Sequence, residues 1–137
     1  IRRLGDEKRV PVLAFVEDVA ASGGYWLASA ADEIWCDPGS MLGSIGVIFS
    51  FPEISKLLDT LGVRMEELKS GDLKAEPSPY KPVSDKARAV SMEMVQDGYQ
   101  WFTGLVAERR KLPIDRVRQL SDGRVYTGRQ AIAVNLI

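Results

Sequence analysis

The sequence predicts an α/β fold, and three observations carry this prediction. The apolar run Val10–Val16 is rich in β-branched and aromatic residues, as in a buried strand of a parallel sheet. A turn of small residues then leads into the alanine-rich stretch Tyr25–Ala31, which indicates a short helix. The C-terminal part, from Ser84 onward, is predicted to be helical. With 137 residues, 45% of them hydrophobic and 27% charged, the chain is expected to form one domain, residues 1–137.

The first half of the chain alternates short strands and helices. Ile1–Leu4 is typical of the last turn of a helix that began earlier, so we expect a fragment of a longer protein. Residues Glu17–Gly24 form a turn, and Ile34–Cys36 is a short strand that ends at Asp37-Pro38-Gly39. A glycine-rich loop is predicted at Gly39–Gly46 and a strand at Val47–Phe49. A helix follows at Pro52–Leu61, with Gly62 at its C-terminal cap, and a further strand at Val63–Leu68.

The second half is predicted to be mainly helical. Lys69–Pro82 contains three prolines and is expected to be irregular. Ser84 is a candidate N-cap for a long helix that extends to about Lys111. Shorter helices should follow, from Pro113 or Asp115 to about Leu120, and from Gly128 to Leu136 with Thr127 as its cap. The basic residues at the end of the long helix, Arg109-Arg110-Lys111, are interpreted as a solvated helix end.

The composition excludes several classes of function. The sequence has no histidine, one cysteine and a formal net charge of −1. A Ser-His-Asp triad, a Cys-His dyad, a His-ligated zinc or haem site, a disulfide and a four-cysteine metal site are therefore excluded. The charge argues against a nucleic-acid partner, and no segment has the pattern of a membrane span or a signal peptide. Acid–base chemistry would have to come from Lys, Asp, Glu, Tyr or Cys36.

Ser22 is the candidate nucleophile. It lies in Ala20-Ala21-Ser22-Gly23-Gly24, a near relative of the G-x-S-x-G elbow, after a predicted strand and before a predicted helix. In that place the amide N–H of Gly23 is free to stabilise an oxyanion. The alternative is that these residues only form a tight strand-to-helix turn.

Lys74 is the candidate base, because a serine hydroxyl needs one and lysine is the known substitute for histidine. A lysine base needs a pKa well below its ordinary value of about 10.4, which burial can produce. The alternative for Lys74 is an exposed loop lysine. Ser44, in the glycine-rich loop, could orient the amine. Ser78-Pro79-Tyr80-Lys81 matches S-x-x-K, but its prolines oppose the helix that this motif requires.

At these residues the sequence resembles the signal peptide peptidase A (protease IV) family. The segments that carry the resemblance are Val19–Trp26, Gly43–Val47, Gly71–Lys74 and Asp122–Ala131. The resemblance implies a ClpP/crotonase-like fold, truncated on its N-terminal side, and a serine endopeptidase with a Ser-Lys dyad. It makes Ser22 the nucleophile, Lys74 the general base, Ser44 a residue that hydrogen-bonds the lysine, and Gly23 an oxyanion donor.

The resemblance also implies substrates, partners and a location. Family members degrade leftover signal peptides at the bacterial cytoplasmic membrane, so we expect peptide substrates, an anchor outside this chain and an extracytoplasmic catalytic domain. Homo-oligomers are expected, in which the lysine of one protomer can complete the site of another. A second oxyanion donor would come from an upstream Asp-Ser-Pro-Gly-Gly-like loop. No cofactor and no metal are expected.

Two alternative functions stay open. The chain could be a catalytically inert piece that folds and oligomerises. It could also be a crotonase-like acyl-CoA enzyme, which would use the oxyanion device without a Ser22 nucleophile.

Overall fold

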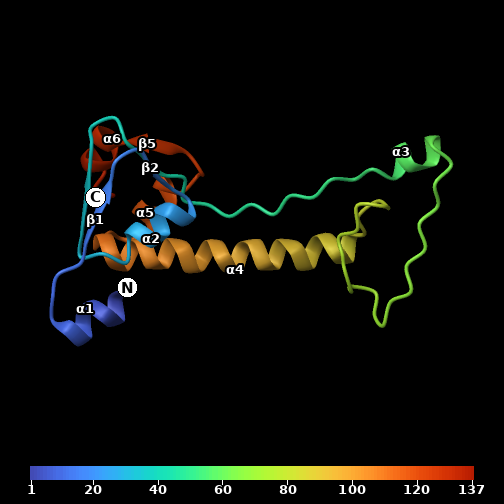
Figure 1. Cartoon of the computed structure of the whole chain (residues 1–137), viewed down its shortest axis with the longest axis horizontal. Coiled ribbons are helices and arrows are strands. Elements are labelled where there is room, and N and C mark those ends of the chain that lie inside the picture. The colour runs from blue at the N-terminus through green and yellow to red at the C-terminus, as the bar shows by residue number, and fades with distance from the viewer. The chain divides into compact units, whose positions relative to one another are not determined.

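The computed structural model describes residues 1–137, apart from the side chain of residue 4, and it divides into two compact units. The first unit comprises Ile1–Val47 and Gly98–Ile137, and the second comprises Ile48–Asp97. Helices and short strands, both parallel and antiparallel, occur together (Figure 1), so the predicted α/β class is confirmed as a mixed α/β structure.

The first unit contains a two-stranded parallel sheet. Strand β1 (Leu13–Val16) pairs with β3 (Glu33–Cys36), with Leu13 opposite Glu33 and Val16 opposite Cys36. Both strands were predicted, although the apolar run around β1 is less buried than a central parallel strand would be. Phe15 is 76% exposed, and β1 pairs with β3 alone in this sheet of the described chain.

A second sheet of three strands lies in the same unit. Strand β2 (Val19–Ala21) is parallel to β4 (Met41–Gly43), which in turn is antiparallel to β5 (Val125–Thr127). The sequence indicated turns or loops where β2 and β4 lie and gave no sign of β5. Each strand has only three residues, and pairing with distant residues creates it, so local periodicity could not reveal it.

The first unit also contains helices. They are α1 (Arg2–Lys8), α2 (Gly23–Ala28), α5 (Ile114–Leu120), α6 (Gly128–Ala133) and the part of α4 (Asp85–Arg110) from Gly98 onward. The helix expected at Ile1–Leu4 continues to Lys8, and the last helix ends earlier than predicted. Thr127 caps α6 as predicted, in a capping box with Gln130.

One apolar core holds the first unit together. It includes residues from α2, β4, α4, α5, β5 and α6, among them Tyr25, Leu42, Phe102, Val106, Val117, Tyr126 and Ala131. Two of these side chains, Tyr25 and Leu42, are completely buried next to the segments that contain the predicted site residues.

The second unit is mostly irregular before its share of α4 (Figure 1). It contains α3 (Ser55–Thr60), shorter than the predicted helix, and the residues of α4 up to Asp97. The strands predicted at Val47–Phe49 and Val63–Leu68 are not formed, and the described residues there have no strand partner. The irregular character of Lys69–Pro82 is confirmed, as is the N-cap, because Ser84 Oγ accepts a hydrogen bond from the Ala87 N–H at 3.1 Å.

None of the helices in the part of the chain that the structure describes is long and apolar enough to cross a membrane.

Candidate active site

Ser22 occupies a sharp turn between a strand and a helix. Strand β2 ends at Ala21 and helix α2 begins at Gly23, and between them Ser22 has φ 52° and ψ −120°. An L-residue rarely adopts this conformation, which costs about 1–3 kcal/mol. The serine is exposed, and in the described structure its hydroxyl makes no capping hydrogen bond to α2. The hydroxyl is therefore available to a reacting group.

Two of the predicted site residues, Ser22 and Ser44, have a positive φ. Among the described residues, six that are not glycine have a positive φ. Three of them, Arg9, Lys111 and Asn135, lie within two residues after the end of a helix, where a left-handed residue is ordinary. The other three are Ser22, Ser44 and Ala75, the residue that follows Lys74. Such backbone conformations cluster at functional sites.

Local and long-range hydrogen bonds hold the backbone around Ser22. The Ser22 N–H donates to the Gly43 carbonyl at 2.7 Å, and the Ser22 carbonyl accepts from the Trp26 N–H at 3.0 Å. The hydroxyl of Tyr25, in the first turn of α2, donates to the Leu136 carbonyl at 2.5 Å. Burial raises the pKa of Tyr25 to about 12, so this phenol stays protonated and keeps donating.

The other end of α2 is held by Arg109, at the end of α4. Arg109 donates from Nε to the Ser29 carbonyl at 2.8 Å and from Nη2 to the Ala31 carbonyl at 2.6 Å. The interpretation of Arg109 as part of a solvated helix end is therefore wrong. The guanidinium satisfies carbonyls at and beyond the C-terminus of α2, which have no partner inside the helix.

The two glycines after Ser22 face open space. A Cβ atom at Gly23 or at Gly24 would have no described heavy atom within 4 Å beyond its chain neighbours and the helix backbone. At the start of a helix their amide N–H groups have no carbonyl one turn earlier to bind. The site thus combines an exposed hydroxyl, amide donors and free room beside them.

Ser44 lies next to the residue that binds the Ser22 backbone. It is half-buried, has φ 49°, and its N–H donates to the Arg124 carbonyl at 2.8 Å. The first unit thus contains Ser22, Gly23 and Ser44, and the Ser22–Gly43 hydrogen bond connects the two glycine-rich segments.

Lys74 belongs to the second unit, and its pairing with Ser22 stays a prediction. It lies in a turn in which its N–H donates to the Gly71 carbonyl at 3.0 Å, and it is exposed. The burial that a lysine base would need is therefore not present within the described chain.

An ion-pair cluster is formed by residues on both sides of Lys74 in the chain. Lys69 Nζ lies 2.9 Å from both Glu67 Oε2 and Glu76 Oε1, and Lys81 Nζ lies 2.5 Å from Glu76 Oε1. Ser78 Oγ donates to Glu67 Oε1 at 3.2 Å. The hydrogen bonds from Lys81 and Lys69 lower the pKa of Glu76 to about 2. These contacts join the segments before and after Lys74.

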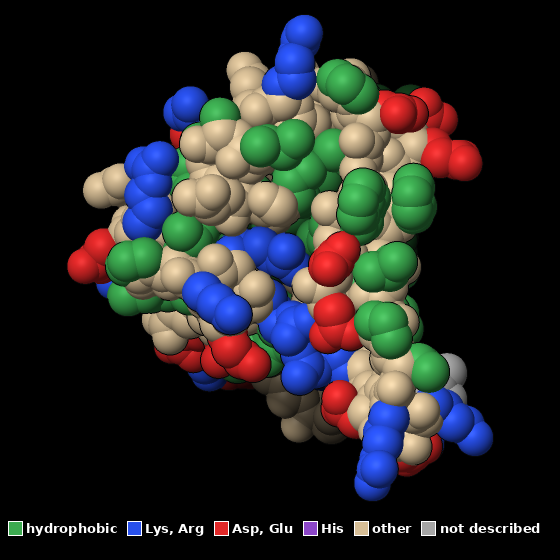
Figure 2. All heavy atoms as spheres, turned by 90° about the vertical axis from the view of Figure 1, so that its left-hand side faces the viewer, with side chains coloured by type: hydrophobic (Ala, Val, Ile, Leu, Met, Phe, Trp, Pro, Cys, Tyr) green, Lys and Arg blue, Asp and Glu red, His purple; other side chains and the backbone are tan. Residues whose placement is uncertain are grey.

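Hollows line the described part of the first unit, among them an apolar one and a charged one. An apolar groove of about 580 Å³ runs along β1 and β2 and reaches Gly24, with Val16, Ala20 and Leu27 among its lining residues. Figure 2 shows hydrophobic side chains reaching the surface in several groups between charged ones.

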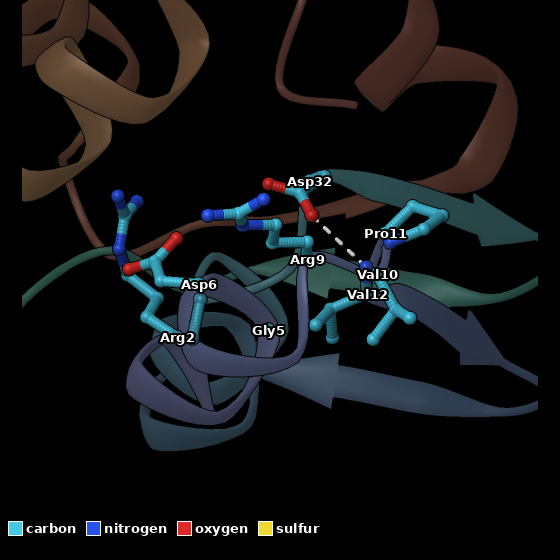
Figure 3. A pocket seen from close by; sticks show the side chains of 9 residues that line it. Arg2, Gly5, Asp6, Arg9, Val10, Pro11, Val12 and Asp32 are labelled. Carbon is cyan, nitrogen blue, oxygen red and sulfur yellow. Dashed lines mark hydrogen bonds between the residues drawn. The ribbon is translucent and has the colours of Figure 1, made fainter.

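The second hollow, of about 360 Å³, lies beside α1 and contains the charged side chains of Arg2, Asp6, Arg9 and Asp32 (Figure 3). The Asp32 carboxylate accepts a hydrogen bond from the Val12 N–H at 2.9 Å. This carboxylate therefore holds the backbone just before β1. Among the described residues, no group of three or more Asp, Glu, His or Cys is placed to hold a metal ion.

Comparison with known proteins decides the family. The model of peptidase family S49 matches residues 5–137. The chain belongs to peptidase family S49. This confirms the resemblance to signal peptide peptidase A and protease IV.

Named relatives agree with the S49 assignment. The chain is 38% identical over 128 residues to a protein of Enterococcus faecium named "Putative signal peptide peptidase SppA", covering 93% of this chain and 37% of that protein. It is 36% identical over 141 residues to "Serine protease SPPA, chloroplastic" of Arabidopsis thaliana, covering 100% of this chain and 20% of that protein. It is 31% identical over 127 residues to "Protease 4" of Haemophilus influenzae, covering 93% and 20%. The S49 chain described here thus spans well under half the length of these relatives.

Proposed function

We propose that this S49 chain is the catalytic part of a serine peptidase with Ser22 as its nucleophile. The observation that carries the proposal is the backbone of Ser22, φ 52° and ψ −120°, at an exposed strand-to-helix turn. A fold retains so unfavourable a conformation where it aims a reactive side chain. The names of the relatives from Arabidopsis thaliana and Haemophilus influenzae, a serine protease and a protease, support the same reaction class.

The proposed reaction uses Lys74 as the base. Neutral Lys74 takes the proton of Ser22 Oγ while that oxygen attacks the carbonyl carbon of the scissile peptide. The Gly23 N–H stabilises the oxyanion, and an upstream loop of the longer protein supplies a second donor. Protonated Lys74 gives its proton to the leaving amine, and a water that Lys74 then deprotonates hydrolyses the acyl-enzyme. Ser44 accepts a hydrogen bond from the Lys74 amine and orients it.

The proposed substrates are short hydrophobic peptides, above all the remnants of signal peptides. The apolar groove that reaches Gly24 supports this class, because its walls suit aliphatic side chains. We further propose a ClpP/crotonase-like arrangement for the complete domain. The intact protein would form a homo-oligomer at the extracytoplasmic side of the bacterial inner membrane, with a dyad that can form within one chain or between two.

Labelling with a fluorophosphonate probe tests the proposal on the intact protein. The wild-type protein should be labelled at Ser22, and Ser22→Ala should abolish labelling. Lys74→Ala should slow labelling by about 10²–10⁴-fold, the usual contribution of a general base. Lys86→Ala is the matched control, since Lys86 is an exposed lysine of the same unit, paired with Asp72 at 3.6 Å, and should behave as wild type.

Other outcomes would favour the alternatives. Full labelling of Ser22→Ala, or of Lys74→Ala, would contradict the assigned roles. An intact protein that stays unlabelled and cleaves no peptide would favour the inert oligomerising module. Turnover of a CoA thioester that survives Ser22→Ala would favour a crotonase-like enzyme.

A further inference from the structure

A tyrosine ring lies directly against the glycine that binds the Ser22 backbone. Gly43 ends β4 with φ 86°, and a Cβ atom there would lie 2.7 Å from Cδ2 and 3.3 Å from Cε2 of Tyr126. Tyr126 is in β5, opposite Leu42 in the antiparallel ladder, and is 7% exposed. The ring therefore fills the space that the missing side chain of Gly43 leaves.

The tyrosine is itself anchored. Its hydroxyl donates to the Leu120 carbonyl, at the end of α5, at 3.0 Å. Next to Gly43 in the chain, the Ser44 N–H donates to the Arg124 carbonyl at 2.8 Å. Gly43 thus contacts the Tyr126 ring, and the residue after it is hydrogen-bonded to the same C-terminal segment.

The carbonyl of Gly43 is the acceptor for the Ser22 N–H at 2.7 Å. Ser22 lies in a conformation that costs about 1–3 kcal/mol, so it will relax if its backbone contacts loosen. A displacement of Gly43 removes the acceptor from its place and lets the Ser22 turn open. The path from Tyr126 to Ser22 therefore consists of one ring contact and one hydrogen bond.

We propose that Tyr126 is a positioning residue for Ser22 and acts through Gly43. This inference rests on the proposed function of Ser22 as a nucleophile. The ring is the acting part, because it touches Gly43, whereas the hydroxyl only anchors the ring. Substitutions that keep the ring should keep the reaction, and substitutions that remove it should slow the reaction more than they weaken substrate binding.

The test compares Tyr126→Phe and Tyr126→Leu in the intact protein. Val117→Ala is the control for lost core packing, since Val117 is fully buried in α5 of the same unit. Measurements are made at a temperature where circular dichroism shows all variants folded. Tyr126→Leu should lower the rate of fluorophosphonate labelling and kcat for a peptide by about tenfold or more, with little change in KM, because misplacement of a nucleophile costs rate. Tyr126→Phe and Val117→Ala should stay within about twofold of wild type.

A second measurement, hydrogen exchange at the Ser22 amide, does not depend on activity. In Tyr126→Leu this amide should exchange about tenfold faster than in Val117→Ala, because its acceptor has moved. Equal labelling and equal exchange in Tyr126→Leu and Val117→Ala would overturn the positioning role. Absence of labelling in the wild type would overturn the proposed function instead, and the exchange experiment would still decide whether Tyr126 holds the Ser22 backbone.

Discussion

At Gly23 the space that a Cβ atom would occupy is empty. Because no described heavy atom beyond its chain neighbours and the helix backbone lies within 4 Å of a Cβ there, Gly23→Ala should fold normally. It should even gain up to about 1 kcal/mol, since alanine favours a helix over glycine. The added methyl group would stand beside Ser22, where a substrate carbonyl must approach. We therefore expect Gly23→Ala to unfold at an equal or higher urea concentration but to be labelled at least about tenfold more slowly by the probe.

Gly104→Ala is the matched control for that experiment. Gly104 is an exposed glycine of α4 in the same unit, and a Cβ there also has nothing within 4 Å beyond the same exclusions. The same gain in stability should come with unchanged labelling. If Gly23→Ala and Gly104→Ala were labelled equally fast, the space beside Gly23 would not belong to the site.

The residues of the candidate site differ in how far the sequence could reveal them. Ser22 and Gly23 stand out because their cue is local, a serine and two glycines between an apolar run and a helix. Gly43 and Arg109 contribute through hydrogen bonds between residues far apart in the sequence. The Gly43 carbonyl accepts from the Ser22 N–H, and the Arg109 guanidinium donates to carbonyls at the end of α2. No local pattern encodes such contacts, since the pairing of β2 with β4 creates the first and the packing of α4 the second.

Among the elements, α6 depends on a cap that can be tested directly. Thr127 Oγ1 accepts from the Gln130 N–H at 3.3 Å, and Gln130 Oε1 accepts from the Thr127 N–H at 2.9 Å. Thr127→Ala should lower the free energy of unfolding by about 1 kcal/mol, because it leaves an amide at the helix start without a partner. Urea denaturation measures this loss. Thr127→Ser keeps the hydroxyl and should stay near wild type, and an equal loss in both variants would contradict the capping role.

Helices were predicted better than strands at this scale, and the reason is physical. The start of α4 and the cap of α6 were found because capping residues and helical spacing are local signals. Strands β2, β4 and β5 have three residues each, too few for a period-two pattern to show. At Val63–Leu68, by contrast, a strand was predicted and is not formed. Apolar residues alone do not make a strand, and no partner strand for this segment is present in the described chain.

At the scale of the whole molecule, the two units rely on different interactions. The apolar core lies in the first unit. In the second unit, by contrast, the loop around Glu76 is held by ion pairs, and the side chain of Glu76 is 4% exposed. The pKa of Glu76 is lowered to about 2 in the folded chain from an ordinary value of 4.5. Its contribution to stability is therefore complete above about pH 4.5 and lost as the pH falls towards 2.

Acid should thus loosen the second unit selectively. The Ser78 N–H, which donates to Glu76 Oε2 at 3.3 Å, should lose its protection from hydrogen exchange between about pH 4.5 and 2. Protection around the buried Tyr25 should persist, because no carboxylate sustains the hydrogen bond from Tyr25 to Leu136. Glu76→Gln should show the low protection of Ser78 already at neutral pH. Protection of Ser78 that did not depend on pH would show that the ion pairs do not hold this loop.

The exposed side of β1 has a consequence for the behaviour of the chain in solution. β1 pairs only with β3 in its sheet of the described chain, and it presents Leu13 and Phe15 at 53% and 76% exposure. An unpaired strand edge next to apolar side chains is a template on which copies of a polypeptide add to one another. At high concentration the isolated chain would therefore tend to self-associate along β1, and its colloidal stability would depend on whatever shields this strand.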